Sequence, residues 1–348
     1  MPIDNIQIVL DNTHSGRQKT MRLLIVVLSV FLLAGTSQCF GTETIKVLIL
    51  DGTFKEIPDT NERLGILDSV KGELLIGYTR YKGNIEVWRG TGGIYLISEL
   101  PLEEYVEGVV ISELSEDWET EAIKAQAVIA RTYALYQKSI NQNKKFHLTS
   151  SVQHQLFSGN NSDTRVSFIV KGTEGEVLTF NGKLIEAFYH STCGGKTENS
   201  EEVFNKERPY LKSVKSECKL SPYQIWNRKI PFSEIEDALG IKGISDIQIR
   251  SFTSSGRVKE LAIITNSNSV VPATEFRKKL GWKKIPSTDF TLKVDGDLLI
   301  LDGRGYGHGV GLCQWGAREM ARKGKTYKEI LSFYYPGTTI ELYEYSGF

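Results

Sequence analysis

Glu113 is the residue in this sequence whose surroundings best suit proton transfer to a substrate. It lies in the segment VVISEL, where Val109, Val110, Ile111 and Leu114 are apolar neighbours. Removing water from a carboxyl raises its pKa, and a carboxyl that stays protonated near neutral pH can serve as the general acid in glycosidic cleavage. Taken alone, an acidic residue at the end of a helix is more often a solvated surface group.

A second group of reactive side chains lies in EAFYHSTCGGK, residues 186–196. The segment has the pattern of a strand that ends in aromatic, imidazole, hydroxyl and glycine groups, and such strand ends often form binding sites. Cys193 beside His190 could be the nucleophile of a hydrolase. In an oxidising compartment, however, Cys193 can form a disulfide with Cys218. We favour this disulfide, which leaves Cys313 over.

A third group is the glycine-rich segment GRGYGHGVGLCQWGA, residues 303–317. Glycine at every second position lets the backbone approach another backbone or a ligand closely around His308. Neither of the common phosphate-binding glycine patterns fits, which disfavours nucleotide binding. We interpret the glycines as the frame of a groove that includes His308 and Gln314. A tight hairpin around a buried histidine is the alternative.

The hydrophobic pattern predicts a mixed α+β fold. Residues 42–100 alternate as short strands separated by turns, which indicates a β-rich segment. Residues 101–345 mix strands and helices without βαβ regularity, so we expect a larger groove-bearing α+β domain there. Helices are predicted near 232–239, 314–323 and 327–335.

Two consecutive helices are expected at the start of the larger domain. The first begins at Pro101 and ends near Glu113, with one apolar face. The second covers about residues 118–138 and is apolar around almost its whole circumference, which predicts burial. Lys124 and Arg131 lie seven residues apart on one face of it. Such charges are costly to bury unless they meet a carboxylate or a ligand.

Composition excludes several classes of protein. The chain has 348 residues, of which 40% are hydrophobic, so it can bury a sizeable core. Its 42 basic and 42 acidic residues leave no net charge, which gives no support to a nucleic-acid partner or to binding at an anionic membrane surface. Four cysteines are too few for a disulfide-rich scaffold.

The amino-terminal region predicts export. Residues 21–41 place one arginine before an apolar run from Leu23 to Ala34, which is the pattern of a signal peptide. A retained membrane anchor is the alternative, although the run is shorter than the roughly 20 residues of a membrane-spanning helix. Residues 1–20 precede this signal and are polar, so we interpret Met21 as the start and 1–20 as a non-native extension.

Several separated motifs resemble the stage II sporulation protein D / LytB family. They are ELPLEEYVEGVVISELSEDWETEAIKAQAVIARTYAL from Glu99, FYHSTCGGKT from Phe188, RPYL from Arg208 and GHGVGLCQWGA from Gly307. The resemblance runs from about Trp88 to Ile340. It implies an extracytoplasmic protein that binds peptidoglycan in the periplasm, in the cell wall or outside the cell, with the membrane contacted only through the signal or anchor.

For the sporulation members, the resemblance implies a lytic transglycosylase that cuts glycan strands already stripped of stem peptides. Glu113 matches the family's catalytic glutamate. It would protonate the oxygen between N-acetylmuramic acid and N-acetylglucosamine and leave anhydro-muramoyl ends. Nine further residues match other family positions and are expected to bind substrate in one groove: Lys124, Gln126, Arg131, Tyr189, His190, Ser191, Thr192, His308 and Gln314.

The resemblance leaves a second function open and contains one departure. The LytB side of the family implies a non-catalytic binder of peptidoglycan that enhances a cell-wall amidase. Some sporulation members also bind zinc near a cysteine pair, whereas this chain has Thr149 and His154 at those positions. Threonine is a poor zinc ligand, and His147 with His154 does not complete a tetrahedral set. We therefore expect no metal there and no other cofactor.

Overall fold

The computed structural model of the chain describes residues 43–49, 65–76, 79–90, 93–152, 154–159 and 163–344. The predicted extension 1–20 and the predicted signal 21–41 lie outside the described residues. Within the described part of the chain, no helix is long and apolar enough to cross a membrane.

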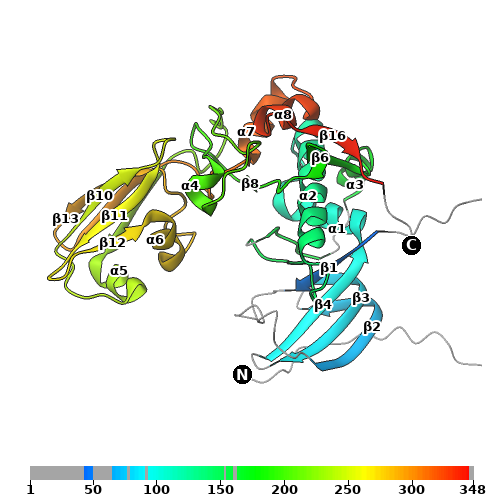
Figure 1. The fold of residues 1–348 in the computed structure, drawn as a ribbon, viewed down its shortest axis with the longest axis horizontal. Coiled ribbons are helices and arrows are strands. Elements are labelled where there is room, and N and C mark those ends of the chain that lie inside the picture. The colour runs from blue at the N-terminus through cyan, green and yellow to red at the C-terminus, as the bar shows by residue number, and fades with distance from the viewer. Residues whose placement is uncertain are drawn as a thin grey trace, which may run out of the picture.

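The described chain forms strands and helices in mixed order, which confirms the predicted α+β class (Figure 1). The strands are β1 (Thr44–Ile49), β2 (Gly65–Ile76), β3 (Thr79–Gly90), β4 (Gly93–Pro101), β5 (Leu148–Thr149), β6 (Glu176–Phe180), β7 (Lys183–Leu184), β8 (Tyr189–His190), β9 (Trp226–Pro231), β10 (Asp246–Phe252), β11 (Val258–Ile264), β12 (Ser269–Pro272), β13 (Phe290–Asp295), β14 (Leu298–Gly303), β15 (Leu312–Cys313) and β16 (Thr339–Leu342). The helices are α1 (Leu102–Glu113), α2 (Thr120–Ile140), α3 (Thr164–Lys171), α4 (Ser200–Phe204), α5 (Phe232–Leu239), α6 (Ala273–Leu280), α7 (Gln314–Arg322) and α8 (Tyr327–Tyr334).

The β-rich opening segment forms most of one five-stranded sheet in the order β2-β3-β4-β1-β5. β1 and β4 are antiparallel, with Ile45 opposite Leu100. Both side chains are buried in a core shared with α1 and α2. Helices α1 and α2 therefore pack against this sheet (Figure 1).

Helix α1 follows β4 directly and ends where the sequence predicted. Pro101 has φ −55° and ψ 138° and precedes the first helical residue. This position suits proline because its backbone nitrogen has no hydrogen to donate. Leu114 is extended, with φ −123° and ψ 153°, so the helix stops at Glu113. This end leaves the Glu113 side chain at the edge of a core rather than inside a continuous helix.

Helix α2 lies at the centre of the molecule, and other elements pack around it (Figure 1). One side belongs to the core with the sheet and α1, and the other contributes Ala125, Val128 and Ile129 to a second core. The second core also contains residues of α7 and α8. The apolar circumference of this helix is thus explained by burial on both sides.

Two very short strands place reactive residues beside each other. β8 and β15 pair in parallel, with Tyr189 opposite Leu312 and His190 opposite Cys313. A separate bridge joins Thr192 to Tyr306. The strand-like segment near residue 190 and the glycine-rich segment therefore meet in the fold, although more than a hundred residues separate them in the chain.

Residues 226–303 have a hydrophobic core of their own, built from β9 to β14 together with α5 and α6. The strands form two three-stranded sheets, β10-β11-β12 and β13-β14-β9. This unit extends away from the helical part of the molecule (Figure 1). The sequence pattern marked no boundary after Leu100, because the unit mixes strands and helices just as its surroundings do.

Candidate active site

The carboxyl of Glu113 is held by three hydrogen bonds from distant segments. The backbone N–H of Leu156 donates to Oε1 at 2.9 Å, and the Tyr189 hydroxyl donates to the same oxygen at 3.0 Å. The amide Nε2 of Gln314 donates to Oε2 at 3.2 Å. These bonds fix the side chain in one orientation. Oε1 accepts two of them and Oε2 accepts one.

Burial raises the pKa of Glu113 above its usual value, and the hydrogen bonds from Leu156, Gln314 and Tyr189 offset part of this rise. Desolvation disfavours the charged carboxylate, whereas donors to its oxygens favour it. Because desolvation is the larger effect, the carboxyl holds its proton to a higher pH than a solvated glutamate. This is the property expected from the sequence around it.

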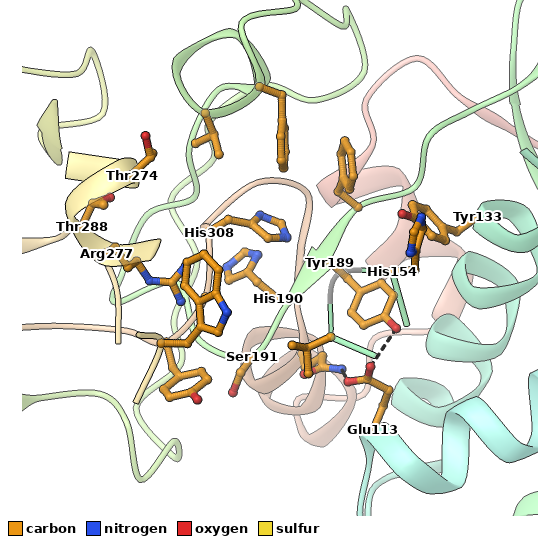
Figure 2. Close-up of a pocket in the computed structure, with 18 of the residues that line it drawn as sticks. Glu113, Tyr133, His154, Tyr189, His190, Ser191, Thr274, Arg277, Thr288 and His308 are labelled. Atoms are coloured by element: carbon orange, nitrogen blue, oxygen red, sulfur yellow. Dashed lines mark hydrogen bonds between the residues drawn. The ribbon is translucent and has the colours of Figure 1, made fainter. Parts of the chain in front are cut away.

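Glu113 opens into a cavity of about 500 Å³, a volume typical of a ligand site. Figure 2 shows the Glu113 carboxyl and the Tyr189 hydroxyl joined by a hydrogen bond, with His190 and His308 further along the cavity. Among the described residues that line this cavity, Glu113 is the only one with a carboxyl. The lining residues are Glu113, Tyr133, Val152, His154, Phe188, Tyr189, His190, Ser191, Val203, Phe204, Thr274, Arg277, Trp282, Lys283, Thr288, Tyr306, Gly307, His308 and Gln314.

Alternate glycines let the glycine-rich segment approach β8 closely. Gly311 has φ +73°, and a Cβ there would lie 1.9 Å from the carbonyl oxygen of Phe188. Gly307 has φ +117°, and a Cβ there would lie 2.7 Å from the Cβ of His190. Any larger residue would push the two segments apart. The glycines thus frame the cavity wall by close backbone contact.

Two of the three histidines that line the cavity, His190 and His308, are held in the neutral form by burial. Their ring centroids are 5.5 Å apart. Burial lowers the pKa of His190, and burial together with His190 and Arg277 holds the pKa of His308 well below its usual value. Nδ1 of His190 lies 3.1 Å from the carbonyl oxygen of Val310. The cavity wall therefore carries two imidazoles without a positive charge.

Five of the nine predicted substrate-binding residues line the cavity: Tyr189, His190, Ser191, His308 and Gln314. Gln126 lies behind them, almost fully buried, with its Oε1 3.5 Å from Nε2 of Gln314. Thr192 is buried and shares a 2.6 Å hydrogen bond with the Ser221 hydroxyl. These two residues support the wall of the cavity from behind.

The expectation that Arg131 and Lys124 also line the groove needs correction. Arg131 is fully buried and makes two 2.7 Å bonds to the carboxylate of Glu103. Lys124 is partly buried and pairs with Glu121, one turn earlier on α2, at 2.9 Å. The physical reason was already visible in the sequence, because a buried charge needs a carboxylate or a ligand. For Arg131 the fold supplies the carboxylate of Glu103, whereas for Lys124 the same helix supplies that of Glu121.

The two cysteines of the predicted disulfide lie together, but as free thiols. The sulfurs of Cys193 and Cys218 are 3.5 Å apart, and both are buried. Cys313, which was expected to be left over, lies beside them. The structure thus shows the proximity that a disulfide needs without the bond, and the bond itself stays a prediction.

The position at which some sporulation members bind zinc has a different set of donors here. The Thr149 hydroxyl is 2.9 Å from Nδ1 of His154, and Nδ1 of His147 accepts a 3.0 Å bond from the backbone N–H of Lys46. A threonine hydroxyl is a poor zinc ligand, and the two imidazoles do not complete a tetrahedral set. The expectation of no metal at this position stays a prediction.

Sequence reasoning missed the cavity residues supplied by the 226–303 unit, namely Thr274, Arg277, Trp282 and Lys283 with Thr288. The Arg277 guanidinium lies 4.4 Å from the centroid of the Trp282 ring. A tryptophan in the polar segment GWKK was the one available signal. It carried no indication that this segment would lie opposite Glu113.

Comparisons with known proteins fit this arrangement. Residues 90–180 match the family described as stage II sporulation protein, and residues 226–311 match a domain of unknown function. Stage II sporulation protein D of Bacillus subtilis is 35% identical over 261 residues, which are 70% of this chain and 75% of that protein. A Brachyspira hyodysenteriae protein described as uncharacterized is 34% identical over 283 residues, 79% of this chain and 76% of that protein.

A more distant relative is the amidase enhancer of Bacillus subtilis, 29% identical over 290 residues, which are 68% of this chain and 40% of that protein. Fold and site together define a mixed α+β protein in which the described residues place one carboxyl in the cavity, carried by the last residue of α1 and hydrogen-bonded by β8 and α7. The chain belongs to the stage II sporulation protein D family, which confirms the resemblance drawn from its motifs.

Proposed function

We propose that this protein is a peptidoglycan lytic transglycosylase that cuts peptide-stripped glycan strands with Glu113 as its acid and base. The observation that carries the proposal is the cavity in which Glu113 is the single carboxyl among the described lining residues, with a pKa that burial raises. Glycosidases that use water or a covalent intermediate have two carboxyls flanking the bond. A lytic transglycosylase needs one, because the substrate's own hydroxyl closes the ring.

In the first half of the reaction, protonated Glu113 gives its proton to the oxygen between N-acetylmuramic acid and N-acetylglucosamine, and the glycosidic bond breaks. In the second half, the Glu113 carboxylate takes the proton of the muramoyl C6 hydroxyl as that oxygen bonds to C1. The 1,6-anhydro ring forms, the carboxyl regains its proton, and no water is consumed. Oε2 suits this exchange because, in the described part of the chain, only Gln314 donates to it.

Tyr189 and Gln314 are positioning residues in this mechanism. Both donate to the carboxyl and stabilise the carboxylate that forms after the first proton transfer. Burial raises the pKa of the Tyr189 hydroxyl well above its usual value, so it stays a donor throughout. These two donors lower the Glu113 pKa that burial raises. The carboxyl can therefore act as an acid and the carboxylate as a base.

The far end of the cavity suits a carbohydrate chain. Trp282 from the 226–303 unit is 37% exposed, and Phe204 and Tyr306 also line the cavity. Aromatic faces pack against the apolar faces of sugar rings, and a small number of polar groups fix their orientation. The neutral imidazole of His308 and the hydroxyls of Ser191 and Thr288 supply such groups.

The test is product analysis on amidase-treated glycan strands. Wild-type protein should generate anhydro-muramoyl ends, seen by mass spectrometry, and no heavy oxygen should enter them when the reaction runs in oxygen-18 water. Glu113→Gln keeps the shape of the side chain and should bind the strands without cutting them. Label in the new ends would indicate hydrolysis, and equal cutting by Glu113→Gln would remove Glu113 from the chemistry.

A second candidate function is enhancement of a cell-wall amidase without catalysis, supported by the identity to the amidase enhancer of Bacillus subtilis. In this case the cavity binds peptidoglycan and Glu113 holds its walls together. The discriminating result is a protein that binds strands, does not cut them with or without Glu113, and raises the rate of a purified cell-wall amidase.

Both functions require a location outside the cytoplasm. The predicted signal at 21–41 supports export to the periplasm, the cell wall or the medium, with contact to the membrane only through that segment. Peptidoglycan strands are the partner in either case, and an amidase would act before or beside this protein. Neither function involves nucleic acid, in agreement with the balanced charge.

A further inference from the structure

Three cysteine sulfurs meet directly behind the wall of the cavity. Cys193 follows β8, Cys313 ends β15, and Cys218 comes from the loop before β9. Their sulfur atoms all lie within 4.8 Å of one another, and all three residues are buried. Zinc bound tetrahedrally at about 2.3 Å from each sulfur would require sulfurs about 3.8 Å apart. The cluster therefore has the spacing of a thiolate metal site.

Backbone N–H groups point at two of the sulfurs. The N–H of Gly195 donates to the sulfur of Cys193 at 3.3 Å. The sulfur of Cys313 accepts from the N–H of Cys193 at 3.2 Å and from the N–H of Gly316 at 3.3 Å, at the start of α7. Such donors and a helix N-terminus stabilise thiolates. Thiolates, and not thiols, bind metal ions.

His190 adds an unused ligand atom next to Cys193. Its Nδ1 faces the carbonyl oxygen of Val310 at 3.1 Å, so Nδ1 must carry the proton, since a carbonyl can only accept. Nε2 is then a lone-pair donor, and it is buried without a hydrogen-bond partner among the described residues. Metal-binding histidines commonly show this pattern, with the far nitrogen bonded to a carbonyl.

A buried arginine, Arg257, lies beside the cysteine cluster. Arg257 is 2% exposed, and its Nη2 donates to the carbonyl oxygens of Cys193 at 2.6 Å and Lys196 at 3.2 Å. Three thiolates and one Zn²⁺ carry a net charge of minus one. The Arg257 guanidinium, which donates to the carbonyl oxygen of Cys193, offsets this charge in a site from which water is excluded.

We propose that Cys193, Cys218 and Cys313 bind one Zn²⁺ in place of the predicted Cys193–Cys218 disulfide, and that Nε2 of His190 moves toward the three sulfurs to become the fourth ligand. Binding displaces the thiol protons and closes the coordination sphere within the protein, as in structural zinc sites. This site is separate from the position of Thr149 and His154, and it does not depend on whether Glu113 cuts glycan.

The zinc would tie together the strands that orient the catalytic carboxyl. Tyr189 and Cys193 lie on one segment, and Gln314 directly follows Cys313. Both Tyr189 and Gln314 donate to Glu113. A metal that joins these segments fixes the two donors relative to each other. Its place is therefore structural, behind the cavity, with no part in proton transfer.

The test is a metal titration of the reduced, metal-free, full-length chain. Co²⁺ should bind one equivalent, with the strong near-ultraviolet absorption of thiolate-to-cobalt charge transfer and the visible bands of a tetrahedral ion, and Zn²⁺ should displace it. Cys193→Ser, Cys218→Ser and Cys313→Ser should each weaken or abolish the charge-transfer band. Cys39→Ser and His154→Ala should leave it unchanged.

Alkylation of the unsubstituted protein tests the proposal even if a cysteine substitution prevents folding. Bound Zn²⁺ should protect all three cysteines from alkylation, as shown by peptide mass spectrometry, and a chelator should restore their reactivity. The proposal is overturned if reduced, folded protein binds no equivalent of Co²⁺ or Zn²⁺. It is also overturned if binding persists in the three cysteine variants and disappears in His154→Ala.

Discussion

Replacing Tyr189 by phenylalanine should raise the pKa of Glu113. The substitution removes the hydroxyl that donates to Oε1 at 3.0 Å and keeps the ring that fills the wall. A hydrogen bond to a charged group contributes about 1.5–3 kcal/mol, and one pKa unit corresponds to about 1.4 kcal/mol. Because 3.0 Å is long for an O–H···O bond, we expect the low end, a rise of about one unit.

The assay is a carbon-13 NMR titration of the glutamate carboxyls, with the Glu113 signal assigned from its absence in Glu113→Gln. If the protein cuts glycan, the loss of activity at high pH should move upward by the same amount, because the acid must be protonated to begin the reaction. Tyr306→Phe is the matched control, since Tyr306 lines the same cavity and is not one of the three donors to the Glu113 carboxyl. An unchanged or lower Glu113 pKa in Tyr189→Phe would refute the assigned hydrogen bond.

Three further predictions concern stability. Burial raises the pKa of Glu113, so the ionised form costs stability above the folded-state pKa; Glu113→Gln should raise the free energy of unfolding at about pH 8, and urea titrations should show this gain vanish below about pH 4, where a solvated glutamate is itself protonated. Glu103→Gln leaves the buried guanidinium of Arg131 without its carboxylate, so it should cost about 3 kcal/mol in the same titration, and a cost under about 1 kcal/mol would place the pair with surface ion pairs. Gly311→Ala should prevent folding or lower the melting temperature severely, whereas Gly324→Ala, which shares a positive φ but meets no atom within 4 Å, should cost only about 1–2 kcal/mol of backbone strain; equal effects would show that close approach is not the reason for glycine at 311.

Local patterns in the sequence were enough to predict the helices around the site. The end of α1 at Glu113 followed from an apolar face that stops before a polar break, and burial of α2 followed from its apolar circumference. Periodicity depends on neighbours within a few turns, so it survives without knowledge of the fold. The raised pKa of Glu113 was predicted on the same basis, because its apolar neighbours are adjacent in the chain.

Contacts between distant segments could not be predicted in this way. The sequence indicated that Arg131 needs a partner but did not show that Glu103 would be that partner, and it therefore left a ligand as an equal choice. Similarly, cysteine spacing favoured one disulfide and one free thiol, whereas the structure brings Cys193, Cys218 and Cys313 into one cluster. The choice among partners depends on which segments the fold places side by side.

The sequence by itself determined the family, the α+β class, the place of Glu113 at the end of a helix and the need for glycine in the segment around His308. Only the tertiary structure decided what surrounds the carboxyl. Gln314, 201 residues away in the chain, donates to it, and the 226–303 unit supplies Trp282 to the opposite end of the cavity. The physical reason is that secondary structure arises from near neighbours, whereas an active site consists of side chains that only packing brings together.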